Sequence, residues 1–176
     1  MNSINIESKD IKTFMNCLLI KDTFDSFLLE EASITTYNTF NIDGHIQKDF
    51  FSPEELSELP DETLSTWATV KPFCFSIIKG NKLPLKFKIV FKAAPYYTQK
   101  LLNECQCGLS LNNVGGLYMN IRYDSRHSLT GESVSSPVLD CVSMASLNIF
   151  TMDKTLEKAW DEKCRKSLLA LTKNEC

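Results

Sequence analysis

The chain has 176 residues, of which 43% are hydrophobic and 23% are charged, and its formal net charge is −3. These are ordinary values for a globular domain, and they exclude a collagen-like or low-complexity chain. A mildly acidic charge also argues against general nucleic-acid binding, which needs a basic surface. We therefore expect one domain, residues 1–176, with a hydrophobic core of its own.

The sequence favours a cytoplasmic protein. No apolar run approaches the roughly 20 residues that cross a bilayer. The first seven residues lack the basic stretch and apolar core of a signal peptide. The seven cysteines are odd in number and widely spaced, which favours free thiols in a reducing compartment.

A short strand at residues 2–6 and then a helix are predicted at the N-terminal end. Ser8 is a residue type that caps helices, and Asp10 suits the first turn. The next apolar residues recur at helical spacing and form one stripe: Ile11, Phe14, Met15, Leu18 and Leu19. This stripe should pack on the core.

Residues 27–42 predict a long strand, because they are rich in Thr, Tyr, Phe and Ile. The Asp43-Gly44 pair that follows is typical of a hairpin turn. A three-residue loop with Gly44 in the left-handed conformation pairs Phe40 with Ile46 and gathers the apolar residues on one face. We therefore predict a first hairpin that turns at Gly44.

A second hairpin is predicted between residues 73–78 and 85–92. Apolar and polar residues alternate in both segments, as they do in strands with one buried face. The loop Gly80-Asn81-Lys82 would pair Ile77 with Leu85. Between the two hairpins, Ser52-Pro53 opens a short capped helix.

The C-terminal half is predicted to alternate helices and strands around a loop. Residues 124–137 are rich in Ser, Gly and Arg and indicate a mobile loop or an irregular hairpin. The regular elements are a helix from Pro95 to Gly108, a strand at 117–123, a strand at 139–150 and a C-terminal helix at 153–172.

The order of these elements suggests an internal duplication. Residues 2–79 read strand, helix, strand, strand, strand, and residues 84–150 follow a similar order. We predict an α+β domain, with a mainly antiparallel sheet, helices on one face and the C-terminal helix added. Two tandem βαβββ units are weakly similar in shape to one domain of a DNA sliding clamp. The helices lack the basic outward faces that DNA contact requires.

Four segments carry a family resemblance. They are Phe27–Phe40 with the Ile42-Asp43-Gly44 turn, Pro72–Gly80, Asn120–Asp124, and Phe150–Lys154 leading into Trp160-Asp161. Together they resemble an uncharacterised family of small proteins from anaerobic Gram-positive bacteria, a domain of unknown function. The resemblance covers nearly the whole chain, which is longer here between Ser125 and Leu139. It implies a bacterial cytoplasmic protein and assigns no activity.

Few residues suggest catalysis. His45 has Asp43 and Asp49 close in sequence, and a carboxylate beside an imidazole can hold a general base, although an exposed histidine after a turn has the same pattern. Glu31 is the one carboxylate on the polar side of the first long strand, and His127 lies in the 124–137 loop. No phosphate-binding loop, dinucleotide-binding pattern, nucleophile elbow or zinc-ligand set is present, so neither a cofactor nor a metal is predicted.

Two strand faces are candidate binding surfaces. The first long strand directs polar side chains to one side: Glu31, Ser33, Thr35, Tyr37, Thr39 and Asn41. Such a face is the wet side of a half-buried sheet or a ligand-binding face. The next strand presents lysines outward: Lys86, Lys88 and Lys92, with Lys79 and Lys82 near the turn. They either protect an edge strand or bind an anionic partner, and Arg122 could join them.

Two functions follow as hypotheses. The first is a non-catalytic binding or assembly module, with a protein partner or anionic ligand at the Lys86, Lys88 and Lys92 face, or a homo-oligomer. Its ligand-binding candidates are Thr35, Tyr37, Asn41, Lys86, Lys88 and Arg122. The alternative is a small enzyme acting on a phosphorylated or carboxylated metabolite, with Glu31 or His45 as the acid–base group. The enzyme requires Glu31 and the Lys86 face on the same side of the sheet.

Overall fold

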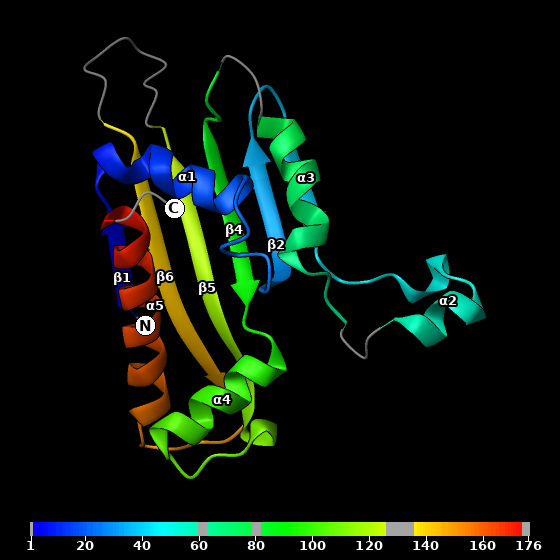
Figure 1. Cartoon of the computed structure of the whole chain (residues 1–176), viewed down its shortest axis with the longest axis vertical. Helices are drawn as coiled ribbons and strands as arrows, with labels where there is room; N and C mark the ends of the chain where they lie inside the picture. The colour runs from blue at the N-terminus through cyan, green and yellow to red at the C-terminus, as the bar shows by residue number, and fades with distance from the viewer. Residues whose placement is uncertain (1, 60–62, 79–81, 126–135, 174–176) are drawn as a thin grey trace.

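The fold is built on one six-stranded antiparallel sheet (Figure 1). The computed structural model of the chain describes residues 2–59, 63–78, 82–125 and 136–173. The strand order is β1-β6-β5-β4-β2-β3. The strands are β1 (Asn2–Ile6), β2 (Leu28–Thr35), β3 (Thr39–Asp43), β4 (Lys86–Lys92), β5 (Val114–Asp124) and β6 (Val138–Leu147).

Four helices cover one face of this sheet (Figure 1). They are α1 (Ile11–Leu19), α3 (Trp67–Ile78), α4 (Pro95–Cys105) and α5 (Thr155–Lys173). The short helix α2 (Pro53–Glu58) stands away from the body, and single 3-10 turns lie at η1 (Ser8–Asp10), η2 (Lys48–Phe50) and η3 (Leu111–Asn113). The predicted α+β class, with an antiparallel sheet and helices on one face, is confirmed. In the part of the chain that the structure describes, no helix combines the length and apolarity needed to cross a bilayer.

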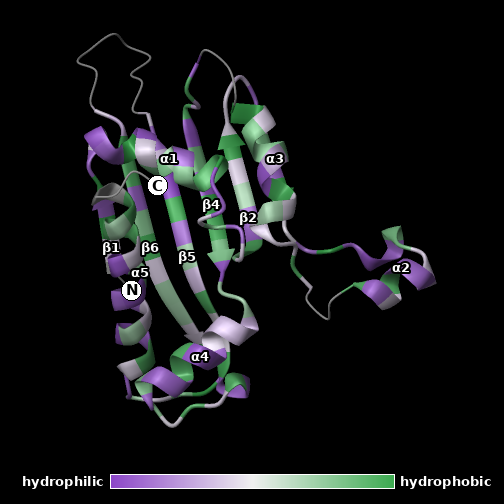
Figure 2. Ribbon diagram, in the orientation of Figure 1, coloured by the Kyte–Doolittle hydropathy of each residue, from purple (hydrophilic) through white to green (hydrophobic). Residues whose placement is uncertain are grey.

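Alternation along the strands separates the two faces of the sheet. On β4, Phe87, Ile89 and Phe91 are buried beneath the helices, whereas Lys86 is exposed and Lys88 is half-buried on the other side. The neighbouring β5 repeats the pattern with four buried side chains: Leu117, Met119, Ile121 and Tyr123. Figure 2 shows the alternation of hydropathy along these strands. We call the two sides the helix face and the open face.

Two tryptophans anchor the helices: one joins α3 to α1, and the other joins α5 to β5. The Trp67 indole N–H of α3 donates to the Leu18 carbonyl at 2.7 Å, and the Trp160 indole N–H of α5 donates to the Tyr118 carbonyl at 2.9 Å. Both rings are almost fully buried, so each bond also satisfies a polar group that water does not reach. Leu156, Cys164 and Leu168 complete the buried stripe of α5.

The predicted second hairpin is wrong, because residues 67–78 form helix α3. The apolar residues 73, 75 and 77 alternate as in a strand, but the buried positions are Trp67, Val70 and Cys74, which have helical spacing. Phe73 is left exposed. The first half of the chain therefore ends in a helix, and the predicted βαβββ order for residues 2–79 does not hold.

The predicted turn at Gly44 is also wrong. The β2–β3 hairpin turns at residues 36–38 and pairs Ile34 with Phe40, so Phe40 does not pair with Ile46. Gly44 instead lies where its own backbone passes close to the backbone of β2. Its amide donates to the Glu30 carbonyl, and a Cβ there would lie 1.8 Å from the Leu29 carbonyl oxygen.

The predicted elements of the C-terminal half are present with small shifts. The strand expected at 139–150 is β6, which ends at Leu147. The Asp153 carboxylate accepts from the Thr155 amide and caps α5, which begins two residues later than predicted. Within the predicted loop, residues 126–135 lie outside the described residues, and so do the predicted candidates Lys79 and His127.

The cysteines follow the sequence expectation in part. Five of them are free thiols: Cys74, Cys105, Cys107, Cys141 and Cys164. Burial raises the pKa of the Cys74 and Cys141 thiols to about 12, so both stay protonated at neutral pH. Cys17 is disulfide-bonded, and the expectation of a free thiol is wrong for this residue.

We predict that Gly44→Ala lowers the free energy of unfolding by roughly 1–3 kcal/mol, because a methyl group there collides with backbone atoms that cannot rotate away. Urea denaturation measures this loss. Gly108→Ala is the control: Gly108 has φ +70° but open space around it, so the cost is about 1 kcal/mol. Equal losses in the two variants would contradict the close-approach role of Gly44.

Candidate functional site

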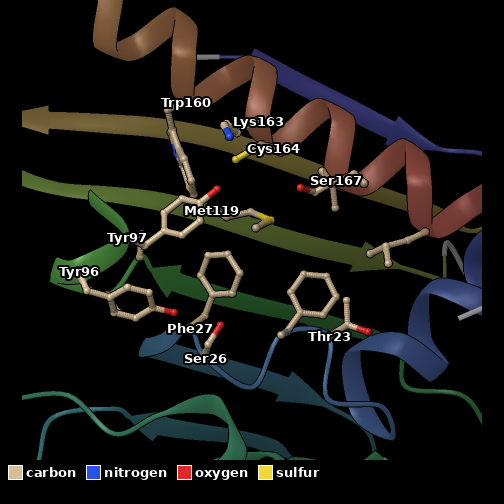
Figure 3. Close-up of a pocket in the computed structure, with 15 residues that line it drawn as sticks. Thr23, Ser26, Phe27, Tyr96, Tyr97, Met119, Trp160, Lys163, Cys164 and Ser167 are labelled. Carbon is tan, nitrogen blue, oxygen red and sulfur yellow. The ribbon is translucent and has the colours of Figure 1, made fainter. Parts of the chain in front are cut away.

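A cavity of about 260 Å³ opens on the helix face between α4, α5 and the segment before β2 (Figure 3). We call it the helix-face pocket. Met119 of β5 forms part of its floor, and α5 contributes Trp160 and Cys164. Tyr97 of α4 and Phe27 close two further sides.

The pocket exists because small residues follow β4. Ala93 and Ala94 line it where the chain passes from β4 into α4, and Pro95 then starts the helix. Larger side chains at these two alanines would fill the space. Helix α5 is held over the neighbouring strands by the Trp160 bond to Tyr118 and by a hydrogen bond from the Ser143 hydroxyl to the Asp161 carboxylate. The void therefore lies beside the anchored part of α5.

Five of the 15 residues that line the pocket are aromatic. Tyr97 meets Trp160 edge to face, with ring centroids 6.1 Å apart. On the other side, Phe27 stacks on Phe91 at 5.6 Å and contacts Phe24 at 6.1 Å. Such walls favour a flat, apolar ligand, because ring faces and edges pack on one another at these distances.

A few polar groups converge on the same space. Figure 3 shows the Tyr97 hydroxyl directed toward the side where Lys163 and Cys164 lie, and Ser167 lines the pocket from the next turn of α5. Burial raises the pKa of Tyr97, so its hydroxyl remains a hydrogen-bond donor at neutral pH. Burial also raises the pKa of the Cys164 thiol, which keeps it protonated.

One ion pair spans the gap between α4 and α5 at this pocket. The Lys163 ammonium lies 2.9 Å from a Glu104 carboxylate oxygen. This hydrogen bond raises the pKa of Lys163 and lowers that of Glu104, so both stay charged at neutral pH. A positive charge therefore stands at the pocket wall, where it could meet the polar end of a ligand.

A second cavity, of about 410 Å³, lies on the open face, and we call it the open-face groove. Four of the predicted ligand-binding residues line it together: Thr35, Lys86, Lys88 and Arg122. They converge because registered antiparallel pairing places Lys88 opposite both Ser33 and Arg122, and Arg122 opposite Asp140. One polar row thus crosses the centre of the sheet.

The other two ligand-binding candidates lie outside the groove. Asn41 is on the edge strand β3, where it continues the polar row opposite Ser33. Tyr37 sits in the β2–β3 turn with 85% of its surface exposed. The structure therefore brings four of the six candidates together.

The two acid–base candidates lie near the β2–β3 edge. Glu31 is on the open face, on the same side as Lys86, and it forms an ion pair with Lys88. His45 Nδ1 lies 2.6 Å from Asp43 Oδ1, and hydrogen bonds from the His45 amide and ring lower the pKa of Asp43. Asp43 is opposite Glu31 in the β2–β3 register, but neither Glu31 nor His45 lines the groove.

Sequence reasoning missed the helix-face pocket. Tyr97, Trp160 and Cys164 lie on the apolar sides of two predicted helices, and that pattern predicts packing but does not reveal a void between the helices. One feature of the sequence could have indicated this pocket: the Ala93-Ala94 pair is followed by two tyrosines in the first turn of a helix. Among the described residues, no group of three His, Cys, Asp or Glu side chains is placed to hold a metal ion.

Comparison with known proteins places the chain in a family. The model of a family of unknown function (DUF5721) matches residues 17–173. The chain belongs to this family. Searches of curated proteins and of solved structures found no match. Membership of DUF5721 confirms the predicted resemblance to a domain of unknown function and supplies no activity.

We predict that iodoacetamide modifies Cys164 much more slowly than the partly exposed Cys107. The thiolate is the nucleophile, and burial raises the pKa of Cys164, so little thiolate forms near pH 8, which is about where an unperturbed thiol titrates. The rate at which iodoacetamide modifies Cys164 should rise as the pH increases further. Peptide mass spectrometry over a time course gives both rates. Modification of Cys164 as fast as Cys107 would contradict its burial in the pocket wall.

Proposed function

We propose that this protein is a non-catalytic binding module of the bacterial cytoplasm that holds a small, mainly aromatic molecule in the helix-face pocket. The bacterial cytoplasmic setting rests on the family resemblance of the sequence. The observation that carries the proposal is the convergence of aromatic walls and a few polar groups on one cavity. Tyr97, Trp160 and Phe27 come from separate parts of the chain, and all face the same space.

The volume of the pocket suits a ligand of one or two rings. An apolar cavity of about 150 Å³ is enough to hold benzene. The helix-face pocket measures about 260 Å³ and adds hydroxyl groups and the Lys163 ammonium. A fused-ring molecule with one hydroxyl or carboxylate would use both the rings and the polar end.

The groups of the open-face groove are less suited to a free small anion. Lys88 is already paired with Glu31, and Lys86 lies 3.7 Å from an Asp124 carboxylate oxygen. A small anion would have to compete with these carboxylates for both lysines. In the helix-face pocket Lys163 is likewise paired, with Glu104, but the aromatic walls can hold an apolar ligand without displacing that carboxylate, which is why we prefer this pocket.

The alternative function is a small enzyme acting on a phosphorylated or carboxylated metabolite. One observation favours it: Glu31 lies on the same side of the sheet as Lys86 and Lys88. The enzyme hypothesis requires these groups on one side of the sheet, and Glu31 meets that requirement. The carboxylate is engaged by Lys88 and lies outside the groove lining, so the arrangement supports binding better than acid–base chemistry.

We predict that 2-naphthol binds the protein at one site and quenches tryptophan fluorescence, because Trp160 is part of the pocket wall. Ala94→Leu should weaken this binding by about tenfold or more, since the added carbons occupy the cavity. Fluorescence titration and calorimetry measure the affinity.

The matched control is Ala170→Leu, which adds the same atoms to an exposed position of α5 outside the pocket. Its affinity for 2-naphthol should equal that of the unaltered protein. No saturable binding, or equal binding by Ala94→Leu and the unaltered protein, would overturn the proposal.

A further inference from the structure

A long excursion leaves the body of the protein between β3 and α3. We call residues 45–64 the acidic arm, of which 60–62 lie outside the described residues. Its base is a two-stranded stem, where His45 bridges Leu64 and the Ile46 amide donates to the Thr63 carbonyl at 2.8 Å. Figure 1 shows α2 standing at the end of this stem, away from the sheet.

The arm is ordered locally but buries little. Ser52 and Glu55 form a reciprocal capping box at the start of α2, and Pro53 occupies the first turn. Neither η2 nor α2 has a buried residue. An isolated helix shorter than about 12 residues is marginal in water, so this arrangement needs a surface to pack on.

Apolar side chains are displayed at the end of the arm. Phe50 meets Phe51 edge to face, with ring centroids 5.3 Å apart, yet 85% of Phe50 is exposed. Leu56 of α2 is exposed as well. Exposed aromatic residues on a protruding segment are typical of a docking element.

The arm also carries a charge opposite to that of the body. Residues 45–64 contain one lysine and six carboxylates, a net charge of −5. The rest of the chain holds 18 basic and 16 acidic residues, a net charge of +2. Complementary surfaces on one chain favour association between copies of that chain.

The open-face groove is the surface on the body that suits the arm. Arg122 lies there without an ion-pair partner among the described residues, and Lys86 is held loosely by Asp124 at 3.7 Å with both side chains exposed. Val138 adds apolar lining. A carboxylate-rich segment with an aromatic tip would find both kinds of partner in this groove.

We propose that the acidic arm of one copy occupies the open-face groove of a second copy, and that the exchange is reciprocal. The occupant is a second copy because the arm points away from its own sheet and because arm and body are opposite in charge. Reciprocal exchange gives a closed two-fold dimer, whereas one-way exchange would continue into a chain of copies. The inference does not depend on the helix-face pocket.

The test is sedimentation of the full chain and of two charge-reversed variants. The unaltered protein should form a dimer that weakens as salt is added, because exposed charges are screened. The arm variant Glu54→Lys/Glu58→Lys spares the capping box, and the groove variant is Lys86→Glu/Arg122→Glu. Each should raise the dimer dissociation constant by about tenfold or more. An equimolar mixture of the two should recover a heterodimer, because reversed arm and reversed groove attract each other.

The matched control is Asp10→Lys/Asp22→Lys, which makes the same change in net charge outside the arm and should leave the dimer intact. Phe50→Ser tests the apolar tip and should weaken the dimer without changing charge. If the groove variant loses its circular dichroism spectrum, Arg122→Gln replaces it. A monomeric protein, a dimer insensitive to the arm changes, or a mixture that stays monomeric would each overturn the proposal.

Discussion

One-sided burial of the sheet is the constraint on which the rest of this structure depends. Strand β4 places Phe87, Ile89 and Phe91 under the helices and its lysines in water, and β5 continues that division in register. Because the side-chain period of a strand is two residues, a slip of one residue would bury the charges and expose the rings. This penalty fixes the strand register, and the register in turn fixes which residues meet on the open face and where α4 and α5 can pack.

The parts of the fold that follow from local alternation or helical spacing were predictable. The C-terminal helix and the strand at 117–123 are correctly predicted because one pattern describes each element. Helix α3 was missed because Phe73, Phe75 and Ile77 alternate as residues of a strand do. Only the packing of Trp67 and Cys74 in the core favours the helix over the strand. Gly44 was misread for a related reason. A turn and a close backbone approach both need glycine, and the sequence alone does not distinguish them.

The two cavities differ in how far a sequence can anticipate them. Thr35, Lys86 and Arg122 were expected on outward strand faces, and they meet because adjacent strands carry them in register. The helix-face pocket is a gap between elements distant in the sequence, and its size depends on how α5 sits over β5 and β6. No local pattern encodes such a gap. Ala93 and Ala94 mark its position only once the helices above them are known.

The pairing of β1 with β6 gives the chain a late closing step. Asn5 donates a hydrogen bond to Asp140, 135 residues away, and α5 packs against both of these strands. A contact of that sequence separation forms slowly because a long loop must close first. During synthesis, β1 therefore stays unpaired with β6 until β6 itself has left the ribosome. Helix α5 follows β6 in the sequence, so the helix-face pocket closes only after all six strands of the sheet have been made.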